Sequence, residues 1–212
     1  MAATSGLPAV RSSAGSWHDG GVIPLKGKLL LATPPLADPN FDRTVVLMLE
    51  HGDEGALGLV LNRPTAEDID ELLPAWRPLV TGDPVLFDGG PVEHAAVIGL
   101  AWVRPDPYDL DDRSDEFDEE VVEEGLGTVD LSGDPFGLTD RVEQLRLFRG
   151  YAGWGPGQLE DELEANAWIV LDADRGDPFT GAPQSLWRDV LRRQGGPLAR
   201  MGDRIPDDVS VN

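Results

Sequence analysis

The chain has 212 residues and a formal net charge of −22, because 39 Asp and Glu residues stand against 17 Lys and Arg. A surface this acidic repels phosphate backbones and anionic lipid headgroups, which argues against nonspecific binding to nucleic acids or membranes. The chain also has no cysteine, which excludes disulfides, thiolate nucleophiles and cysteine-based zinc or iron–sulfur centres.

The length suits one domain, which we predict over residues 22–212. Residues 1–21 are rich in Ala, Ser and Gly and lack the apolar core of a signal peptide, so we predict a flexible leader there. No stretch approaches the roughly 18–20 apolar residues of a membrane span. We therefore expect a cytoplasmic protein that does not enter a membrane.

Runs of β-branched and apolar residues between Gly or Pro positions indicate strands, and capping residues beside apolar faces indicate helices. In chain order, the sequence predicts a strand at 27–33, a helical turn at 38–41, strands at 44–51 and 57–62, a helix at 65–73, strands at 84–88, 95–103, 127–131 and 145–151, a helix at 158–167, a strand at 168–172 and a helix at 186–194. The turn from Gly52 to Gly55 predicts a hairpin. Thr65 and Ser185 are the expected N-caps of the first and last full helices.

Residues 106–124 differ sharply in composition from the rest of the chain. They contain eleven Asp or Glu residues and one Arg. Such a segment buries too little apolar surface to offset the entropy of ordering it. We predict a solvated, mobile loop or acidic insertion that is dispensable for folding.

The densest cluster of glycines lies between Gly150 and Gln158, after a predicted strand and before a predicted helix. Glycine allows tight turns and close backbone approach, and a helix N-terminus favours anions. The segment lacks the Lys and Ser/Thr of a phosphate-binding P-loop. We predict a turn here, in which Gly153, Gly155 and Gly157 are held where a Cβ would clash.

Seven segments between about residues 22 and 195 carry a family resemblance in their order and spacing. They are Leu25–Pro34, Asp38–Val46, Glu50–His51, Gly55–Pro64, Asp88–Val92, Gly150–Leu159 and, in the last helix, Leu186–Trp187 with Val190–Leu191. In these segments the chain resembles the AlgH/YqgE family of bacterial proteins, although its acidic residues 106–124 depart from the usual pattern. The resemblance implies a single α+β domain with a mixed, partly curled β-sheet and packed helices. Members have been labelled transcriptional regulators, largely by genetic association, and the resemblance brings no reaction or cofactor with it.

Several polar, glycine and aromatic residues at predicted strand ends are candidates for one binding site. They are Asn62, Arg63, Asp88, Gly89, Gly90, Tyr151, Trp154 and Gln158. If they converge, with Tyr151 or Trp154 anchored against residues 62–64, they form a small pocket with a cation, amide donors and aromatic walls. In the structural alternative, Arg43 or Arg63 pairs with Asp38 or Asp88, and the glycines serve close packing.

His51 is the best single acid–base candidate, since histidine titrates near neutrality. Its neighbour Glu50 points to the opposite face of a strand and cannot easily orient the ring, so a structural hydrogen bond is the alternative role. No metal, nucleophile or nucleic-acid motif is present. We expect a protein that binds a small metabolite or a partner protein without cofactor or metal. The alternatives are an enzyme of unrecognised type using Arg63, His51 and Glu50 or Asp88 and, more distantly, a regulator that binds DNA directly.

Overall fold

A computed structural model describes residues 24–34, 38, 40–104, 121–123 and 125–204. The predicted leader and most of the predicted acidic loop lie outside these residues. Contacts divide the chain into two compact units. Residues 24–187 form one unit, and the described part of the other, residues 188–204, contains most of helix α3 (Leu186–Gln194) and all of α4 (Gly196–Arg204). One domain over 22–212 remains a prediction.

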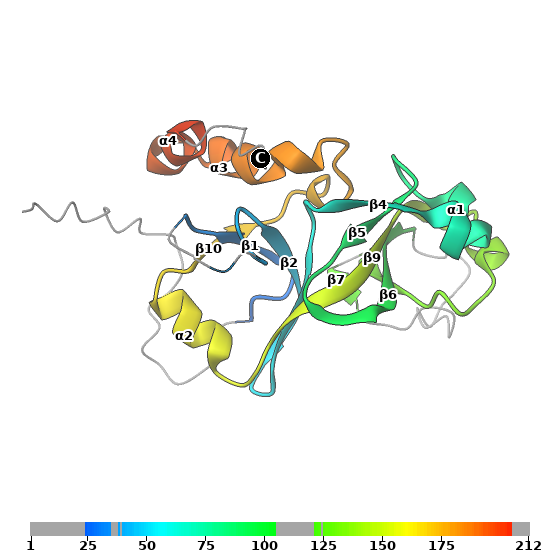
Figure 1. The fold of residues 1–212 in the computed structure, drawn as a ribbon, viewed down its shortest axis with the longest axis horizontal. Coiled ribbons are helices and arrows are strands. Elements are labelled where there is room, and N and C mark those ends of the chain that lie inside the picture. The colour runs from blue at the N-terminus through cyan, green and yellow to red at the C-terminus, as the bar shows by residue number, and fades with distance from the viewer. Residues whose placement is uncertain (1–23, 35–37, 39, 105–120, 124, 205–212) are drawn as a thin grey trace, which may run out of the picture. The chain divides into compact units, whose positions relative to one another are not determined.

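Ten strands of the first unit form one mixed sheet (Figure 1). They are β1 (Lys28–Ala32), β2 (Val45–Gly52), β3 (Gly55–Val60), β4 (Pro64–Asp68), β5 (Val85–Asp88), β6 (Val92–Val103), β7 (Val121–Glu123), β8 (Leu126–Val129), β9 (Val142–Trp154) and β10 (Trp168–Asp172). The main path runs β10-β1-β2-β3-β9-β6-β8-β7, while β4 pairs with β5 and β5 pairs with β9. Only the β5–β9 strand pair is parallel among these ten strands.

Short helices complete the first unit. They are α1 (Ile69–Leu72), α2 (Gln158–Glu164) and the 3-10 helices η1 (Pro74–Leu79), η2 (Pro135–Leu138), η3 (Asp177–Phe179) and η4 (Pro183–Ser185). Helices and a mixed sheet that do not alternate regularly make this an α+β fold, so the predicted fold class is confirmed. No helix in the described ranges is long and apolar enough to cross a membrane.

Strand β9 joins the two halves of the sheet (Figure 1). Its first part, Val142–Arg149, pairs with β6, and Phe148 and Arg149 also pair with β5. Its last part, residues 152–154, pairs with β3 instead. The glycine turn expected after the predicted strand 145–151 is therefore wrong over residues 152–154, which continue β9. The turn is confined to residues 155–157, immediately before α2.

The helix predicted at 65–73 is wrong over its first four residues, which belong to β4. The Thr65 hydroxyl does not cap a helix but donates to the Leu86 carbonyl at 2.9 Å. Asp68 is the N-cap of α1, since its side chain accepts the Asp70 N–H. Pairing between β4 and β5 outweighs the local helical pattern, as tertiary contacts often do.

Three further local predictions need correction. Residues 40–43 form a turn rather than a helical turn, with the Asp38 carboxylate accepting the Asn40 N–H at 2.8 Å. Strand β7 lies within the predicted acidic loop and places Val122 in the core. Helix α4 follows α3 and was not predicted, although Pro197 in its first turn is a typical helix-start signal.

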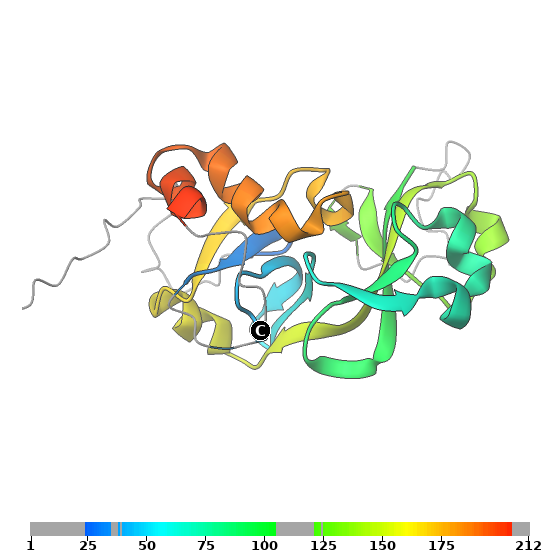
Figure 2. The same ribbon diagram turned by 45° about the horizontal axis from the view of Figure 1, so that its top comes forward.

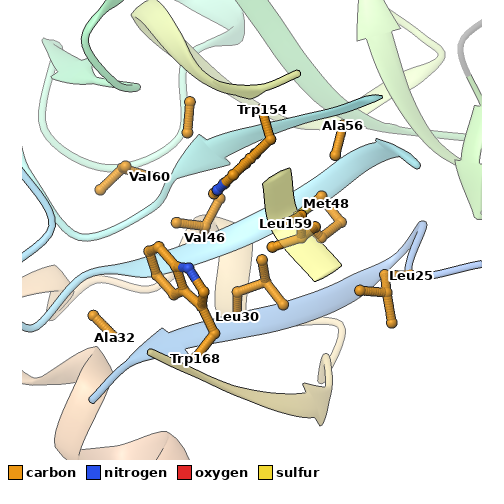
Figure 3. Close-up of a cluster of buried hydrophobic side chains, with 11 residues drawn as sticks. Leu25, Leu30, Ala32, Val46, Met48, Ala56, Val60, Trp154, Leu159 and Trp168 are labelled. Atoms are coloured by element: carbon orange, nitrogen blue, oxygen red, sulfur yellow. The ribbon is translucent and has the colours of Figure 1, made fainter. Parts of the chain in front are cut away.

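Two buried clusters stabilise the two halves of the sheet. The first joins β1, β2, β3 and β10 to α2 and the end of β9, and Figure 3 shows Trp154, Trp168 and Leu159 within it. The second lies beneath α1, η1 and η2, where Ile69, Trp76 and Leu138 pack with residues of β5, β6, β8 and β9. At about 25 cal/mol per Å² of apolar surface, burial of such side chains is the main favourable term in folding.

Candidate functional site

An open depression of about 660 Å³ lies at the turn of the β2–β3 hairpin. Its lining is Lys26, Glu50, His51, Gly52, Asp53, Glu54, Gly55, Ala56, Leu57, Val92, Tyr151, Gly153 and Trp154. Apolar and aromatic side chains line it together with three carboxylates and one lysine. Two of the predicted site residues, Tyr151 and Trp154, belong to this lining, and so do His51 and Glu50 of the alternative enzymatic site.

His51 is buried in this lining, with only 2% of its side chain exposed. The Leu25 N–H donates to Nδ1 at 3.2 Å, and Nε2 lies 2.9 Å from Glu160 Oε1. Because Nδ1 accepts a hydrogen bond, the ring proton is assigned to Nε2, which donates to Glu160. Glu160, not the adjacent Glu50, orients the imidazole. Nδ1 thus connects β2 to the segment before β1, and Nε2 connects it to α2. These are the structural hydrogen bonds expected as the alternative to an acid–base role for His51.

Trp154 and Gln158 converge on Glu162 of α2. Glu162 Oε2 accepts the indole N–H of Trp154 at 2.9 Å and that of Trp168 at 2.7 Å. Gln158 Nε2 donates to Glu162 Oε1 at 3.0 Å, and its own Oε1 accepts the Gly155 N–H at 3.1 Å. These contacts fix the turn before α2. None of these four hydrogen bonds joins Trp154 or Gln158 to residues 62–64.

The Asn62 side chain hydrogen-bonds to backbone groups at the start of the β2–β3 hairpin. Its Oδ1 accepts the Val45 N–H and its Nδ2 donates to the Arg43 carbonyl, both at 2.9 Å. Arg63 Nη2 lies 3.4 Å from the Asp42 carbonyl oxygen. The Arg63 carbonyl accepts the Asp88 N–H at 2.8 Å. Arg63 therefore meets Asp88 through the backbone, while the Asn62 side chain binds the backbone of residues 43 and 45.

Gly89, Gly90 and Gly150 form a glycine junction where β9 changes partners. A Cβ on Gly90 would overlap backbone atoms of Tyr151, and one on Gly89 would overlap the Gly150 carbonyl oxygen. A Cβ on Gly150, where φ is +64°, would lie 2.6 Å from the Gly90 oxygen and 2.7 Å from the Val92 oxygen. The junction lets the connection between β5 and β6 approach β9 closely, so these glycines serve packing.

The prediction that a Cβ would clash at Gly153, Gly155 and Gly157 is wrong. A Cβ on Gly153 would meet a carbon of the Tyr151 ring at 3.3 Å, which a side chain can relieve by a small shift. A Cβ on Gly155 would meet nothing closer than 3.9 Å, and one on Gly157 nothing within 4 Å. A Cβ on any of the junction glycines would instead meet backbone atoms, and the same is true of Gly55 and Gly58 in β3.

Arg146 on β9 is a buried cation that the sequence pattern does not single out. It is 3% exposed and donates to the carbonyls of Pro178 at 3.0 Å and Thr180 at 2.8 Å. Its guanidinium carbon lies 4.2 Å from the centre of the Phe87 ring. Burial lowers the pKa of Arg146 to about 10, although the charge of Asp83 offsets part of this effect. The group is therefore charged at neutral pH and holds the η3 segment against β9.

Within the described ranges, neither metal ligands nor carboxylates with shifted pKa values gather at the depression. No group of three His, Asp or Glu side chains in these ranges is placed to hold a metal ion. Hydrogen bonds from Arg104 and Ser132 lower the pKa of Glu143 and Asp130 respectively, but both carboxylates are solvated surface groups outside the depression. The fold and the site define the class of this protein as an α+β protein with an open surface depression.

Comparisons with known proteins agree with this class and give the family. A family model described as AlgH-like matches residues 29–199. The chain is 48% identical over 191 residues to a UPF0301 protein of Streptomyces coelicolor, which covers 90% of this chain and 97% of that protein. The chain belongs to the AlgH-like family.

Two solved structures share the fold. The crystal structure of a protein from Corynebacterium diphtheriae matches with a TM-score of 0.75 and 32% identity, over 86% of this chain and 93% of that one. The solution structure of the AlgH protein from Pseudomonas aeruginosa matches with a TM-score of 0.59 and 27% identity, over 86% and 95% of the two chains. The α+β architecture is therefore that of the family.

Proposed function

We propose that this protein is a non-enzymatic recognition protein whose depression at the β2–β3 hairpin receives a segment of a partner protein. The observation that carries the proposal is an open, partly apolar surface whose histidine, His51, is already held by the fold through both ring nitrogens. Small-molecule sites are usually concave enough to bury most of their ligand. An open depression suits a protruding segment of a larger partner better than it suits a metabolite.

Two kinds of side chain in the depression are accessible to a partner: half-buried apolar or aromatic ones and exposed acidic ones. Leu57, Val92 and Tyr151 are half-buried, so part of each side chain faces solvent. Asp53 and Glu54 are exposed at the rim of the same surface. An apolar floor beside carboxylates favours a partner segment that combines an apolar side chain with a positive charge.

An enzyme using the same residues is less well supported. A general base needs a nitrogen or oxygen within hydrogen-bond reach of a substrate proton. The His51 ring is instead held by Leu25 and Glu160, and its side chain is almost wholly buried. Arg63 and Asp88 do not line the depression. The proposed role therefore requires the depression to bind a partner and does not require it to catalyse a reaction. The cytoplasmic location remains a prediction.

Site-specific photo-crosslinking tests the proposed role. A benzoylphenylalanine placed at Asp53 on the rim is expected to give one discrete adduct in an extract of the source organism. The matched control is the same group at Glu164, an exposed α2 carboxylate outside the lining, which removes the same charge. Identical adducts from both positions, or none from Asp53, would contradict the proposal.

Direct binding to duplex DNA is expected to be absent at physiological salt. The chain carries a net charge of −22, and affinity for phosphates depends on clustered Lys and Arg side chains. Proteins that bind DNA non-specifically have dissociation constants of about 1–100 μM at physiological salt. A mobility-shift titration of the purified protein should therefore show no complex at protein concentrations below about 1 μM. Salt-sensitive binding in the submicromolar range would support the regulator label instead.

A further inference from the structure

The two large hydrophobic side chains that are exposed in the described ranges lie at the same end of the sheet. Leu72 of α1 is 47% exposed and Phe136 of η2 is 84% exposed. Helix α1 leads directly into η1, which contacts η2. Figures 1 and 2 show α1 in teal and η2 in light green side by side. Large apolar side chains gathered on a monomer surface commonly mark an interaction site.

Exposed apolar residues of η1 extend this surface. We call it the α1–η2 patch, and it comprises Leu72, Pro74, Ala75, Pro78 and Phe136. None of these residues lines the depression at the β2–β3 hairpin. The patch is therefore separate from the surface of the proposed function.

The core beneath the patch holds it in place. Ile69, Trp76 and Leu138 are buried in one cluster below α1, η1 and η2. The Asp134 carboxylate accepts the Phe136 N–H at 3.0 Å and caps η2. Phe136 is thus exposed on an anchored element, which presents its ring with a small entropic cost of binding.

The charges around the patch are mainly negative. Asp68, Asp70 and Glu71 precede Leu72, and Asp134 and Asp140 flank η2, all of them exposed. Two arginines lie near these carboxylates: Arg77, whose Nε lies 3.7 Å from Asp70 Oδ1, and Arg141, which follows Asp140 and whose backbone N–H donates to the Leu138 carbonyl of η2. A second copy of this chain, with the same net charge of −22, would place like charges opposite one another. The surroundings of the patch therefore favour a cationic partner.

We propose that the α1–η2 patch docks a basic amphipathic segment of a partner protein. Apolar side chains of the segment pack on Phe136 and Leu72, and its Lys or Arg side chains face the carboxylates around the patch. An amphipathic segment laid on an apolar surface is a common mode of recognition. The proposal adds a second contact surface and does not depend on the depression.

The probe is a fluorescein-labelled amphipathic Leu/Lys helix of about five turns, with a scrambled peptide of the same composition as its control. Fluorescence anisotropy follows its binding to the full chain near 0.15 M salt, where longer-range attraction is screened. We expect the amphipathic peptide to bind more tightly than the scrambled one. Leu72→Ser with Phe136→Ser should weaken binding by about tenfold, the effect of losing a typical hot spot. Leu72→Met with Phe136→Leu should retain binding.

Charge variants separate docking from general attraction to an acidic protein. Glu71→Gln with Asp140→Asn should weaken binding several-fold, whereas Asp161→Asn with Glu164→Gln on α2 removes the same charge and should change it less than twofold. Equal effects of the two pairs, equal binding of the scrambled peptide, or no effect of the serine pair would overturn the proposal. So would a dimer in analytical ultracentrifugation that the serine pair dissociates, because a second copy would then cover the patch. Unchanged urea unfolding of every variant shows that the fold is intact.

Discussion

Replacing Gly90 with Ala is expected to lower the free energy of unfolding by about 4–5 kcal/mol, the upper end of single-substitution effects. An added Cβ would overlap the carbonyl group of Tyr151 and the amide nitrogen of Ala152. Those atoms belong to β9 where it passes from β6 to β3, so they cannot move aside as a side chain can. The φ of +143° at Gly90 adds backbone strain for any other residue.

Gly176→Ala is the matched control for this substitution. Gly176 has φ −81°, and a Cβ there would meet nothing within 4 Å. Its effect should stay within about 0.5 kcal/mol. Urea unfolding followed by tryptophan fluorescence measures both variants. Equal midpoints for the two would show that the glycine junction does not require glycine.

Trp154→Ala is expected to cost about 3–5 kcal/mol, because it empties a large volume in the first buried cluster. The Trp154 ring is 6% exposed and lies 5.8 Å from the Trp168 ring and 6.2 Å from the Phe41 ring, measured between centroids. Figure 3 shows both tryptophans within this cluster. The substitution also removes the indole N–H from Glu162, which leaves that carboxylate with fewer partners.

Phe136→Ala provides the comparison, since it also truncates an aromatic ring but does so at a surface position that is 84% exposed. Its unfolding free energy should change by less than about 0.5 kcal/mol. If Trp154→Ala unfolds at the same urea concentration as the wild type, the Trp154 ring is not part of the core.

Local sequence patterns identify most strands correctly because those strands are apolar and bounded by turn residues. β2 and β3 are examples: both are largely buried, and Gly52 and Gly55 lie at the hairpin between them. Pairing partners are not encoded locally. Residues 65–68 look helical in isolation but form β4, because β5 supplies a partner from a distant part of the chain.

The candidate site was harder to predict for the same reason. Tyr151 and Trp154 share a surface with His51, yet this follows only from the pairing of β9 with β3. Glu160 orients His51 across 109 positions of sequence, so no spacing rule points to it. The density of glycine correctly indicates that two backbone segments approach closely. Which glycines of this stretch are needed depends on where Gly89 and Gly90 contact β9, and that position cannot be predicted from local sequence.

The recognition role is tested most directly by adding Tyr151→Ala to the protein that carries the photo-crosslinker at Asp53. Tyr151 is half-buried in the lining of the depression, and its ring lies against Gly153. We expect adduct yield to fall about tenfold, as for loss of an aromatic hot spot, with the urea midpoint little changed. An unchanged adduct yield from a correctly folded Tyr151→Ala protein would contradict the recognition role.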